Sequence, residues 1–216
     1  MPQPDRDVLM ARTLADARRW MTDGTTLFVD TVADLDETEF DAPTLLPGWQ
    51  RRQLVAHVAA NADAVGNLVH WAATGRPTPM YASPDERAAG IQRGTTLTGA
   101  ELLTWLRQSS ERLTVAMETL TDEQWRTEVV TAQGRTVPAT ETPWLRAREV
   151  CVHVVDLARG SGFGDLPHDF LAALVEDIIA KRGEIPTVDG PLAEVAAWLA
   201  GRPHTLADAP ALGPWL

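Results

Sequence analysis

The sequence predicts a mainly α-helical protein built on a four-helix bundle, and three observations support this prediction. Apolar residues recur at spacings of three and four over several long segments, as they do on the buried stripe of an amphipathic helix. Gly and Pro residues separate these segments and bound the helices. A single short region, residues 128–137, departs from the helical period and is typical of strands. Helices of this length pack around a shared core in a bundle.

The first long helix is expected over residues 7–32, where Met10, Leu14, Met21 and Phe28 fall near helical period. A connector follows, in which Leu35 and Phe40 are expected to plug the core. It ends in the run Leu46-Pro47-Gly48-Trp49, which predicts a rigid turn.

The second long helix is expected over residues 51–73 and ends before Gly75-Arg76-Pro77. One face of this helix is formed by Leu54, His57, Asn61, Val65 and Leu68. A short helix is expected over residues 85–94, and a third long helix over 98–120 with Leu102, Leu106, Leu113 and Met117 facing inward.

Residues 128–131 and 135–137 flank Ala132-Gln133-Gly134 and predict a small hairpin. The fourth long helix is expected over residues 142–159, with Thr142 as its N-cap and Pro143 at its first position. Downstream, helices are expected over 167–182 and 191–200, with one short strand within 184–190. We therefore expect a bundle domain at residues 1–165, on which a small C-terminal α(+β) appendage at residues 166–216 packs.

The composition limits the partners and the compartment. The chain has 216 residues, a net charge of -11 and one cysteine, Cys151. An acidic protein lacks the basic surface that nucleic acids and anionic membranes require, so we expect neither as a partner. A lone cysteine fits a reducing compartment, and the N-terminal sequence does not read as a signal peptide. The expected location is cytoplasmic.

His57 and the pair Glu149 and His153 predict a metal site. Glu149 and His153 are four residues apart and share a helix face. If that face packs against the His57 face, two imidazoles and one carboxylate converge, which is the ligand set of a catalytic zinc site with one open position. The alternative is a hydrogen-bonded core histidine beside an ordinary helix pair. A buried carboxylate on an apolar face favours the metal, because a cation removes its cost of burial.

Asn61 and Asp156 are candidates for groups that orient the two imidazoles. For Asp156 the alternative is an exposed partner of Arg159 or Arg148. Cys151 points away from the proposed ligands and is expected to be a buried structural thiol. Trp49 and Trp144 stand at helix starts near the proposed site and are candidates to wall a pocket. The remaining histidines have no partner at ligand spacing and are expected on the surface: His70, His168 and His204.

The chain resembles the mycothiol-dependent maleylpyruvate isomerases, which belong to the DinB-like superfamily of four-helix bundles. The resemblance covers roughly residues 7–165. The segments that carry it are residues 46–49, 54–59, 61–64, 71–75, 79–81 with Arg87 and Ile91, 143–150 and 152–157. In the tail, the run Trp198-Leu199-Ala200-Gly201-Arg202 and the closing Pro214-Trp215-Leu216 match as well. The stretch before them is shortened relative to the family's C-terminal domain, as if most of the strands of that domain were missing.

The resemblance implies that His57, Glu149 and His153 bind a divalent metal, usually zinc. It also implies mycothiol, a thiol of actinobacteria, as cosubstrate, and a small-molecule substrate of aromatic degradation. The implied activity is cis-trans isomerisation of maleylpyruvate, or a similar cis-enoic dicarboxylate, through an activated thiolate. The two substrate carboxylates call for cationic clamps, for which Arg87, Arg148 and Arg202 are candidates and Arg146 is a weaker one.

The family uses a tail arginine, which by motif is Arg202, as a catalytic residue. The alternative is a solvated arginine at a helix C-terminus. Two other functions stay open at this stage: a mycothiol S-transferase acting on an electrophile, and a non-enzymatic zinc-binding regulatory module. A transferase predicts a wider, more apolar pocket, and a regulator predicts a fourth protein ligand that closes the coordination sphere.

Overall fold

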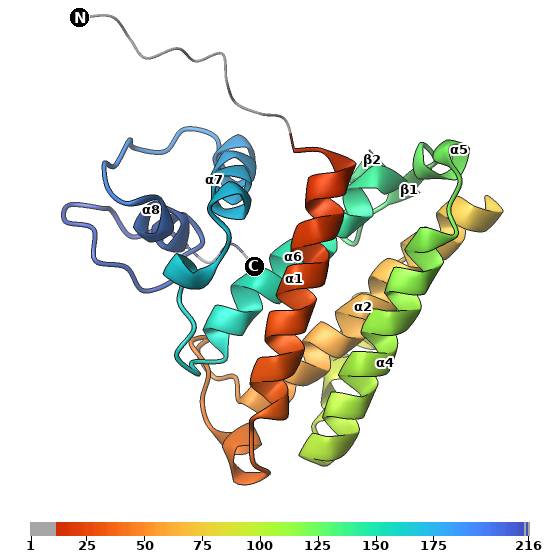
Figure 1. The fold of residues 1–216 in the computed structure, drawn as a ribbon, viewed down its shortest axis with the longest axis horizontal. Coiled ribbons are helices and arrows are strands. Elements are labelled where there is room, and N and C mark those ends of the chain that lie inside the picture. Colours follow the sequence, from red (N-terminus) through yellow and green to blue (C-terminus); the bar gives the residue numbers. More distant parts are fainter. Residues whose placement is uncertain (1–11, 214, 216) are drawn as a thin grey trace, which may run out of the picture.

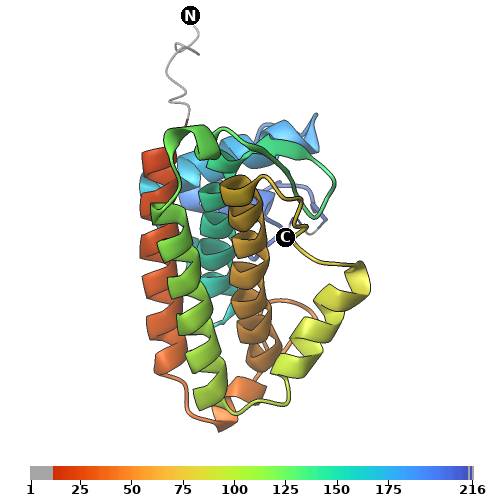
Figure 2. The same ribbon diagram turned by 90° about the vertical axis from the view of Figure 1, so that its right-hand side faces the viewer.

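The computed structural model describes residues 12–213 and residue 215. Four long helices form the bundle: α1 (Leu14–Ala33), α2 (Arg51–Thr74), α4 (Gly99–Glu118) and α6 (Thr142–Asp156) (Figure 1). α1 packs against α6 and α4, and α2 packs against α4 and α6. The four helices therefore close around one core, and Figure 2 shows them side by side. The expected mainly helical bundle is confirmed.

The connections between the bundle helices are short elements. The 3-10 helix η1 (Thr38–Asp41) follows α1, and its Phe40 is buried as expected, whereas Leu35 is half-buried. The helix α3 (Pro84–Gly94) links α2 to α4, close to its expected bounds. The expected hairpin is present as β1 (Glu128–Val130) and β2 (Thr136–Pro138), with Val129 opposite Val137.

Two further connecting elements, like the 3-10 helix η1, were not predicted. The short helix α5 (Asp122–Trp125) precedes the hairpin, and the 3-10 helix η2 (Ala139–Glu141) follows it. A capping box of Thr121 and Gln124 starts α5. Thr121 and Gln124 have the spacing of a capping box, so this helix start could have been predicted from the sequence.

The first helix begins later than the periodicity predicts. The expected start at residue 7 and the inward position of Met10 lie outside the described residues. Arg12 and Thr13 are described and are not helical. The Thr13 side chain accepts a hydrogen bond from the Asp16 backbone N–H at 3.1 Å, and the Asp16 carboxylate accepts from the Thr13 N–H at 3.2 Å. This capping box fixes the start of α1.

The fourth bundle helix differs from the prediction at both ends. Thr142 is its first helical residue rather than its cap, because the Thr142 hydroxyl donates to the Ala139 carbonyl at 2.8 Å. The helix ends at Asp156 instead of Arg159, since Ala158 adopts a left-handed conformation with φ 52°. Arg51 satisfies the carbonyls at this end, donating to Leu157 at 2.7 Å and Ala158 at 3.1 Å.

The C-terminal region contains the 3-10 helix η3 (Phe163–Asp165) and the helices α7 (His168–Arg182) and α8 (Leu192–Leu199). The strand expected within 184–190 is not formed, and residues 183–191 have no regular structure. Pro186 removes one backbone donor. Among the described residues, the sheet consists of β1 and β2 and includes none of these residues. In the part of the chain that the structure describes, no helix is long and apolar enough to cross a lipid bilayer.

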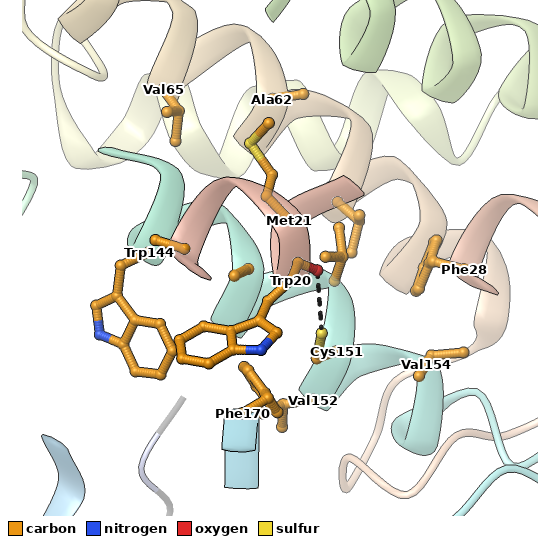
Figure 3. Packing of buried hydrophobic residues seen from close by; sticks show 14 of the residues in the cluster. Trp20, Met21, Phe28, Ala62, Val65, Trp144, Cys151, Val152, Val154 and Phe170 are labelled. Atoms are coloured by element: carbon orange, nitrogen blue, oxygen red, sulfur yellow. Dashed lines mark hydrogen bonds between the residues drawn. The ribbon is translucent and has the colours of Figure 1, made fainter. Parts of the chain in front are cut away.

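Aromatic contacts join the C-terminal region to the bundle. The Phe170 ring of α7 lies 5.9 Å from the Trp20 ring of α1 and 5.7 Å from the Trp144 ring of α6, measured between centroids. Figure 3 shows these three rings with the buried Cys151, whose thiol faces the Trp20 carbonyl at 3.7 Å. The core therefore continues from the bundle into α7, which holds α7 against α1 and α6.

Candidate metal centre

His57, Glu149 and His153 come together between α2 and α6. His57 lies on the buried face of α2, where Leu54, Asn61, Val65 and Leu68 are also buried. Glu149 and His153 are one turn apart on α6, and the packing of α6 against α2 brings them to His57. The convergence that the spacing predicted is present.

The distances between the three side chains suit a tetrahedral metal ion. His57 Nε2 lies 3.1 Å from Glu149 Oε2, and His153 Nε2 lies 3.3 Å from the same oxygen. One ligand atom from each residue lies within 4.8 Å of the others. Ligands held about 2.0–2.1 Å from a zinc ion at tetrahedral corners stand about 3.3–3.4 Å apart. Two nitrogens and one carboxylate oxygen are a donor set that zinc prefers, so the residues fit this ion.

The three side chains are buried together, and burial and their contacts shift their pKa values. Burial raises the pKa of Glu149, but hydrogen bonds from His153 and His57 outweigh this and hold that pKa well below its usual value. Burial lowers the pKa of His57. Burial also acts to lower the pKa of His153, but hydrogen bonds to Asp156 and Glu149 outweigh it and raise that pKa. A stable carboxylate anion is what a cation needs as a ligand.

A chain of charged groups continues behind His153. Asp156 accepts a hydrogen bond from His153 Nδ1 at 2.8 Å and is fully buried, with 0% exposure. The Arg202 guanidinium pairs with both oxygens of Asp156, at 3.0 Å and 2.7 Å. Asp156 is thus not an exposed partner of Arg159 or Arg148. It occupies the imidazole-orienting position that the sequence interpretation gave it.

Arg202 is not where a substrate clamp is expected. Its side chain is 5% exposed, and besides Asp156 it donates to the Ala200 carbonyl at 2.6 Å. It is neither the solvated arginine of the alternative interpretation nor a lining residue of the cavity at the site. The structure makes Arg202 the anchor of Asp156, because both oxygens of this carboxylate are held by one guanidinium.

Asn61 does not orient an imidazole among the described residues. Its side-chain oxygen accepts a hydrogen bond from Arg146 Nη1 at 3.0 Å. Arg146 is 1% exposed and also donates to the Val58 carbonyl at 2.6 Å and the Ser110 hydroxyl at 3.1 Å. Burial lowers the pKa of Arg146 to about 10, so the guanidinium is still charged at neutral pH. Arg146 does not line the cavity at the site and so cannot clamp a substrate directly.

A cavity of about 610 Å³ opens onto the ligand set. His57, Asn61 and Glu149 form part of its wall. Four cationic side chains also line it: Arg87, Arg135, Arg148 and Lys181. Two carboxylates, Glu149 and Asp177, line it as well. The cationic side chains outnumber them, so the lining favours an anionic ligand.

Both arginines expected to bind substrate line this cavity. Arg87, on α3, approaches His57 Nδ1 to 3.5 Å with Nη2 and is otherwise exposed. Arg148, on α6, pairs with Asp177 at 3.0 Å, and burial lowers its pKa. Asp177 in turn pairs with Lys181 at 2.6 Å. Residues 177 and 181 lie on α7, so the C-terminal region completes the cavity.

Several lining residues were missed from the sequence. Tyr81 is the one tyrosine of the chain, and burial raises its pKa. Trp215 lies with its ring 5.1 Å from the Arg148 guanidinium and 5.5 Å from Lys181 Nζ. Asp177 and Lys181 are four residues apart, a spacing that predicts an ion pair on one helix face. Nothing local linked them to a site more than twenty residues upstream.

The other expectations for side chains near the site have mixed outcomes. Trp49 stacks edge-on against His57, with centroids 5.8 Å apart. Trp144 is 1% exposed and belongs to the core with Trp20, so it walls no pocket. Cys151 is buried, as expected, and burial raises the pKa of its thiol. His70 and His168 are exposed, and His204 is half-buried.

Comparisons with known proteins agree with this geometry. The family model described as "Mycothiol maleylpyruvate isomerase N-terminal domain" matches residues 21–158. Among solved structures, the mycothiol-dependent maleylpyruvate isomerase matches with a TM-score of 0.89 and 36% identity, over 94% of this chain and 98% of that one. A histidine-to-alanine mutant described under the same enzyme name matches with a TM-score of 0.85 and 35% identity, over 93% and 98% of the two chains.

A more distant match concerns the fold alone. YfiT from Bacillus subtilis, described as a probable metal-dependent hydrolase with an unusual four-helix bundle topology, has a TM-score of 0.53 and 19% identity. It covers 73% of this chain and 92% of its own. No curated protein matches the chain significantly.

Proposed function

The chain belongs to the mycothiol maleylpyruvate isomerase family, with the DinB-like bundle of that family, and from this premise we propose that it is a zinc-dependent enzyme that isomerises maleylpyruvate with mycothiol as cosubstrate. The product is the trans isomer. The observation that carries the proposal is the ligand set of His57, Glu149 and His153 at the wall of a cavity lined by cationic side chains.

The residues of the chain have distinct roles in this proposal. His57, Glu149 and His153 hold the metal, and Asp156 fixes the ring of His153 through its hydrogen bond to Nδ1. A bound zinc ion supplies an open coordination position at which a thiol loses its proton. If His57 held the metal through one ring nitrogen, the other would carry a proton and could not accept from Arg87, whose guanidinium has only donors. Arg87 would then be available to the substrate, since it lines the cavity.

The reaction proceeds by addition and elimination. The mycothiol thiolate forms a C–S bond at one carbon of the cis double bond, whose π pair moves into the conjugated carbonyl. Rotation about the resulting single bond and expulsion of the thiolate restore the double bond in trans geometry. Arg87 and Arg148 bind the substrate carboxylate that lies farther from the double bond, so the carbon that carries the other carboxylate is free to rotate. No net oxidation or reduction occurs, and zinc has no redox chemistry to contribute.

Two features favour this proposal over the alternatives. The cavity offers four cationic side chains, which suit a dicarboxylate better than the apolar electrophile of an S-transferase. Among the described residues, the metal-ligand cluster has three members. Three ligands leave the open position that a purely regulatory zinc site lacks. The proposal includes a division at residue 165, with the bundle supplying the ligands and the C-terminal region supplying Lys181 and Asp177.

The test is the metal content of the purified protein, followed by a maleylpyruvate assay with and without mycothiol. We expect about one zinc per chain and isomerisation that depends on the thiol. The His57→Ala variant is expected to lose both, because two protein ligands do not hold zinc tightly. His70→Ala, which changes an exposed histidine of the same helix, is the matched control and keeps both. Full zinc occupancy in His57→Ala would refute the ligand assignment.

A further inference from the structure

We propose that Asn61 is a substrate-binding residue whose amide N–H donates into the cavity, and that Arg146 is the positioning residue that holds the amide in this orientation. The proposed function enters only through the identity of the ligand, a cis-enoic dicarboxylate. The ligand set and the two cavity arginines do not depend on this assignment.

The orientation of the Asn61 amide is fixed by chemistry. Arg146 Nη1 lies 3.0 Å from the side-chain atom of Asn61 that faces it. A guanidinium donates hydrogen bonds and accepts none. The amide atom facing Arg146 must therefore be the oxygen, and the opposite rotamer would set two donors against each other. The amide nitrogen is thereby turned away from Arg146.

The amide nitrogen turned away from Arg146 meets the cavity. Asn61 lines the cavity together with His57, which is one turn earlier on α2, and Glu149. The fully buried side-chain atoms without a partner among the described residues are Trp144 Nε1, Arg146 Nε and Arg148 Nε. Asn61 Nδ2 is not one of them, and it donates to no described residue, so it is open to the cavity. A donor there gains a partner when an acceptor enters.

The burial of Arg146 gives a physical reason for this role. The guanidinium is 1% exposed, and its partners are the Val58 carbonyl, the Asn61 amide and the Ser110 hydroxyl. No described carboxylate lies within ion-pair distance of it, although the charges of Glu149 and Asp63 act on it from farther away. A buried cation without a counterion in direct contact is costly. An anionic oxygen at Asn61 would lie on the far side of the same amide, where the charge of Arg146 attracts it.

The ligand atom that fits is therefore a carboxylate oxygen. Asn61 is buried one turn after the metal ligand His57 on α2, whereas Arg135 and Lys181 are exposed. We assign Asn61 the carboxylate nearer the reacting carbons, and the other carboxylate remains with the arginines. Asn61 is then a residue that selects for a dicarboxylate.

The direct test observes the side-chain amide itself. The zinc-loaded full chain is labelled with ¹⁵N, and maleylpyruvate is added without thiol, so that binding occurs without turnover. The Asn61 NH₂ resonances are identified by their absence from the Asn61→Asp variant. Saturating ligand is expected to shift these resonances. If they do not move at saturation, the proposal is overturned, since a merely structural amide has no reason to respond.

Binding measurements on variants test the energetic contribution. Asn61→Ser keeps an oxygen for Arg146 but does not reach the cavity, and it is expected to raise the dissociation constant of maleylpyruvate about 10- to 100-fold. Zinc content is expected to be unchanged. Ser110→Ala removes another hydrogen bond of Arg146, at 3.1 Å and away from the cavity. It is the matched control and binds as the wild type does. Wild-type affinity in Asn61→Ser overturns the proposal.

The positioning role of Arg146 has its own signature. Arg146→Lys retains a donor-only cation and is expected to keep most of the affinity. Arg146→Gln offers an acceptor as well, so the Asn61 amide is free to turn. This variant is expected to shift the Asn61 resonances before any ligand is added and to weaken binding as Asn61→Ser does. Equal binding by both Arg146 variants overturns the positioning role.

These outcomes separate the present proposal from the proposed function. If the wild type does not isomerise maleylpyruvate with mycothiol, the proposed function fails, while the binding and resonance measurements still decide the role of Asn61. If the wild type turns the substrate over and the Asn61 variants bind it normally, the proposed function stands and the present proposal is overturned. Absence of measurable maleylpyruvate binding by the wild type overturns it too.

Discussion

The side chains behind the metal centre form one continuous chain of hydrogen bonds. It runs from His153 to Asp156 and on to Arg202, and each of the three is at most 5% exposed. Burial raises the pKa of Asp156, but hydrogen bonds from His153 and Arg202 outweigh this and lower it. These three side chains are shielded from water, so each charge is stabilised by its neighbour in the series. Removal of one charge leaves another buried and unpaired.

Replacing Arg202 therefore tests this chain of charges. Arg202→Ala leaves Asp156 buried without its counterion and is expected to destabilise the protein by about 3–5 kcal/mol. It is also expected to weaken zinc binding about 10- to 100-fold, since His153 loses its fixed orientation. Thermal unfolding and zinc titration measure the two effects. The control is Arg159→Ala, whose half-exposed ion pair with Glu39 contributes at most about 1 kcal/mol.

Slower turnover of Arg202→Ala with unchanged zinc affinity would contradict the anchoring role. It would restore the interpretation of Arg202 as a group that acts on the substrate.

Asp177 gives the protein a defined sensitivity to acid. Burial raises its pKa, but the charges of Arg148 and Lys181 outweigh this and lower it. A carboxyl whose folded pKa lies below the unfolded value of about 3.9 stabilises the protein above that pH, and this contribution is lost as pH falls through the folded pKa. Asp177→Asn is therefore expected to destabilise by about 1–3 kcal/mol at pH 7.

The same difference is expected to shrink as the pH falls below about 3.9 and through the folded pKa, because the wild-type carboxyl then becomes protonated in the folded protein as well. Denaturant unfolding of both proteins at several pH values measures it. A difference that stays constant down to pH 2 would assign the loss to packing rather than to charge.

At the scale of elements, the site depends on how closely α1 approaches α6. A Cβ at Gly24 of α1 would stand 2.4 Å from the Cys151 sulfur and 2.7 Å from Val150 Cγ2. Cys151 and Val150 lie between Glu149 and His153 on α6, so α1 supports the back of the ligand helix. Only glycine permits this approach.

Gly24→Ala is expected to destabilise the protein by about 1–3 kcal/mol, because α6 must shift or its side chains must leave their rotamers. Zinc affinity is expected to fall as well, since the two ligands of α6 move with the helix. Gly66→Ala on α2 meets nothing within 4 Å and is the matched control. It is expected to stabilise by up to about 1 kcal/mol. If Gly24→Ala behaves like Gly66→Ala in thermal unfolding, α1 does not press on α6.

At the scale of the whole molecule, the C-terminal region is part of the core and of the cavity. Phe170 is fully buried between Trp20 and Trp144, and Trp20 Nε1 donates to Asp169 at 3.0 Å. Lys181 and Asp177 reach the cavity from α7, and Arg202 reaches Asp156 from beyond α8. Bundle and C-terminal region are therefore expected to unfold together.

Phe170→Ala tests this coupling. Loss of a buried phenylalanine side chain is expected to cost about 3–5 kcal/mol. Calorimetry is expected to show a single transition at a lower temperature. An early separate transition that leaves the zinc-bound bundle intact would show that the two regions are independent.

The sequence by itself determined the four-helix bundle and the three candidate ligands. Helical period assigns Leu54, His57 and Asn61 to one face before any packing is known, and it sets Glu149 and His153 on another. Apolar faces must be buried against each other, so the polar residues they carry meet. Caps were in reach of the sequence as well: the pairs Thr13–Asp16 and Thr121–Gln124 mark helix starts that periodicity misplaced or missed.

Only the tertiary structure decided which partners the long polar side chains take. Arg202 was expected over the substrate and instead holds Asp156, and Asn61 was expected against an imidazole and instead meets Arg146. The strand expected within 184–190 needed a neighbouring strand, and the sheet among the described residues consists of β1 and β2. A helix face is a local property of about four residues. The partner of a guanidinium is set by every element within reach of a side chain with several rotatable bonds, and no local pattern contains that information.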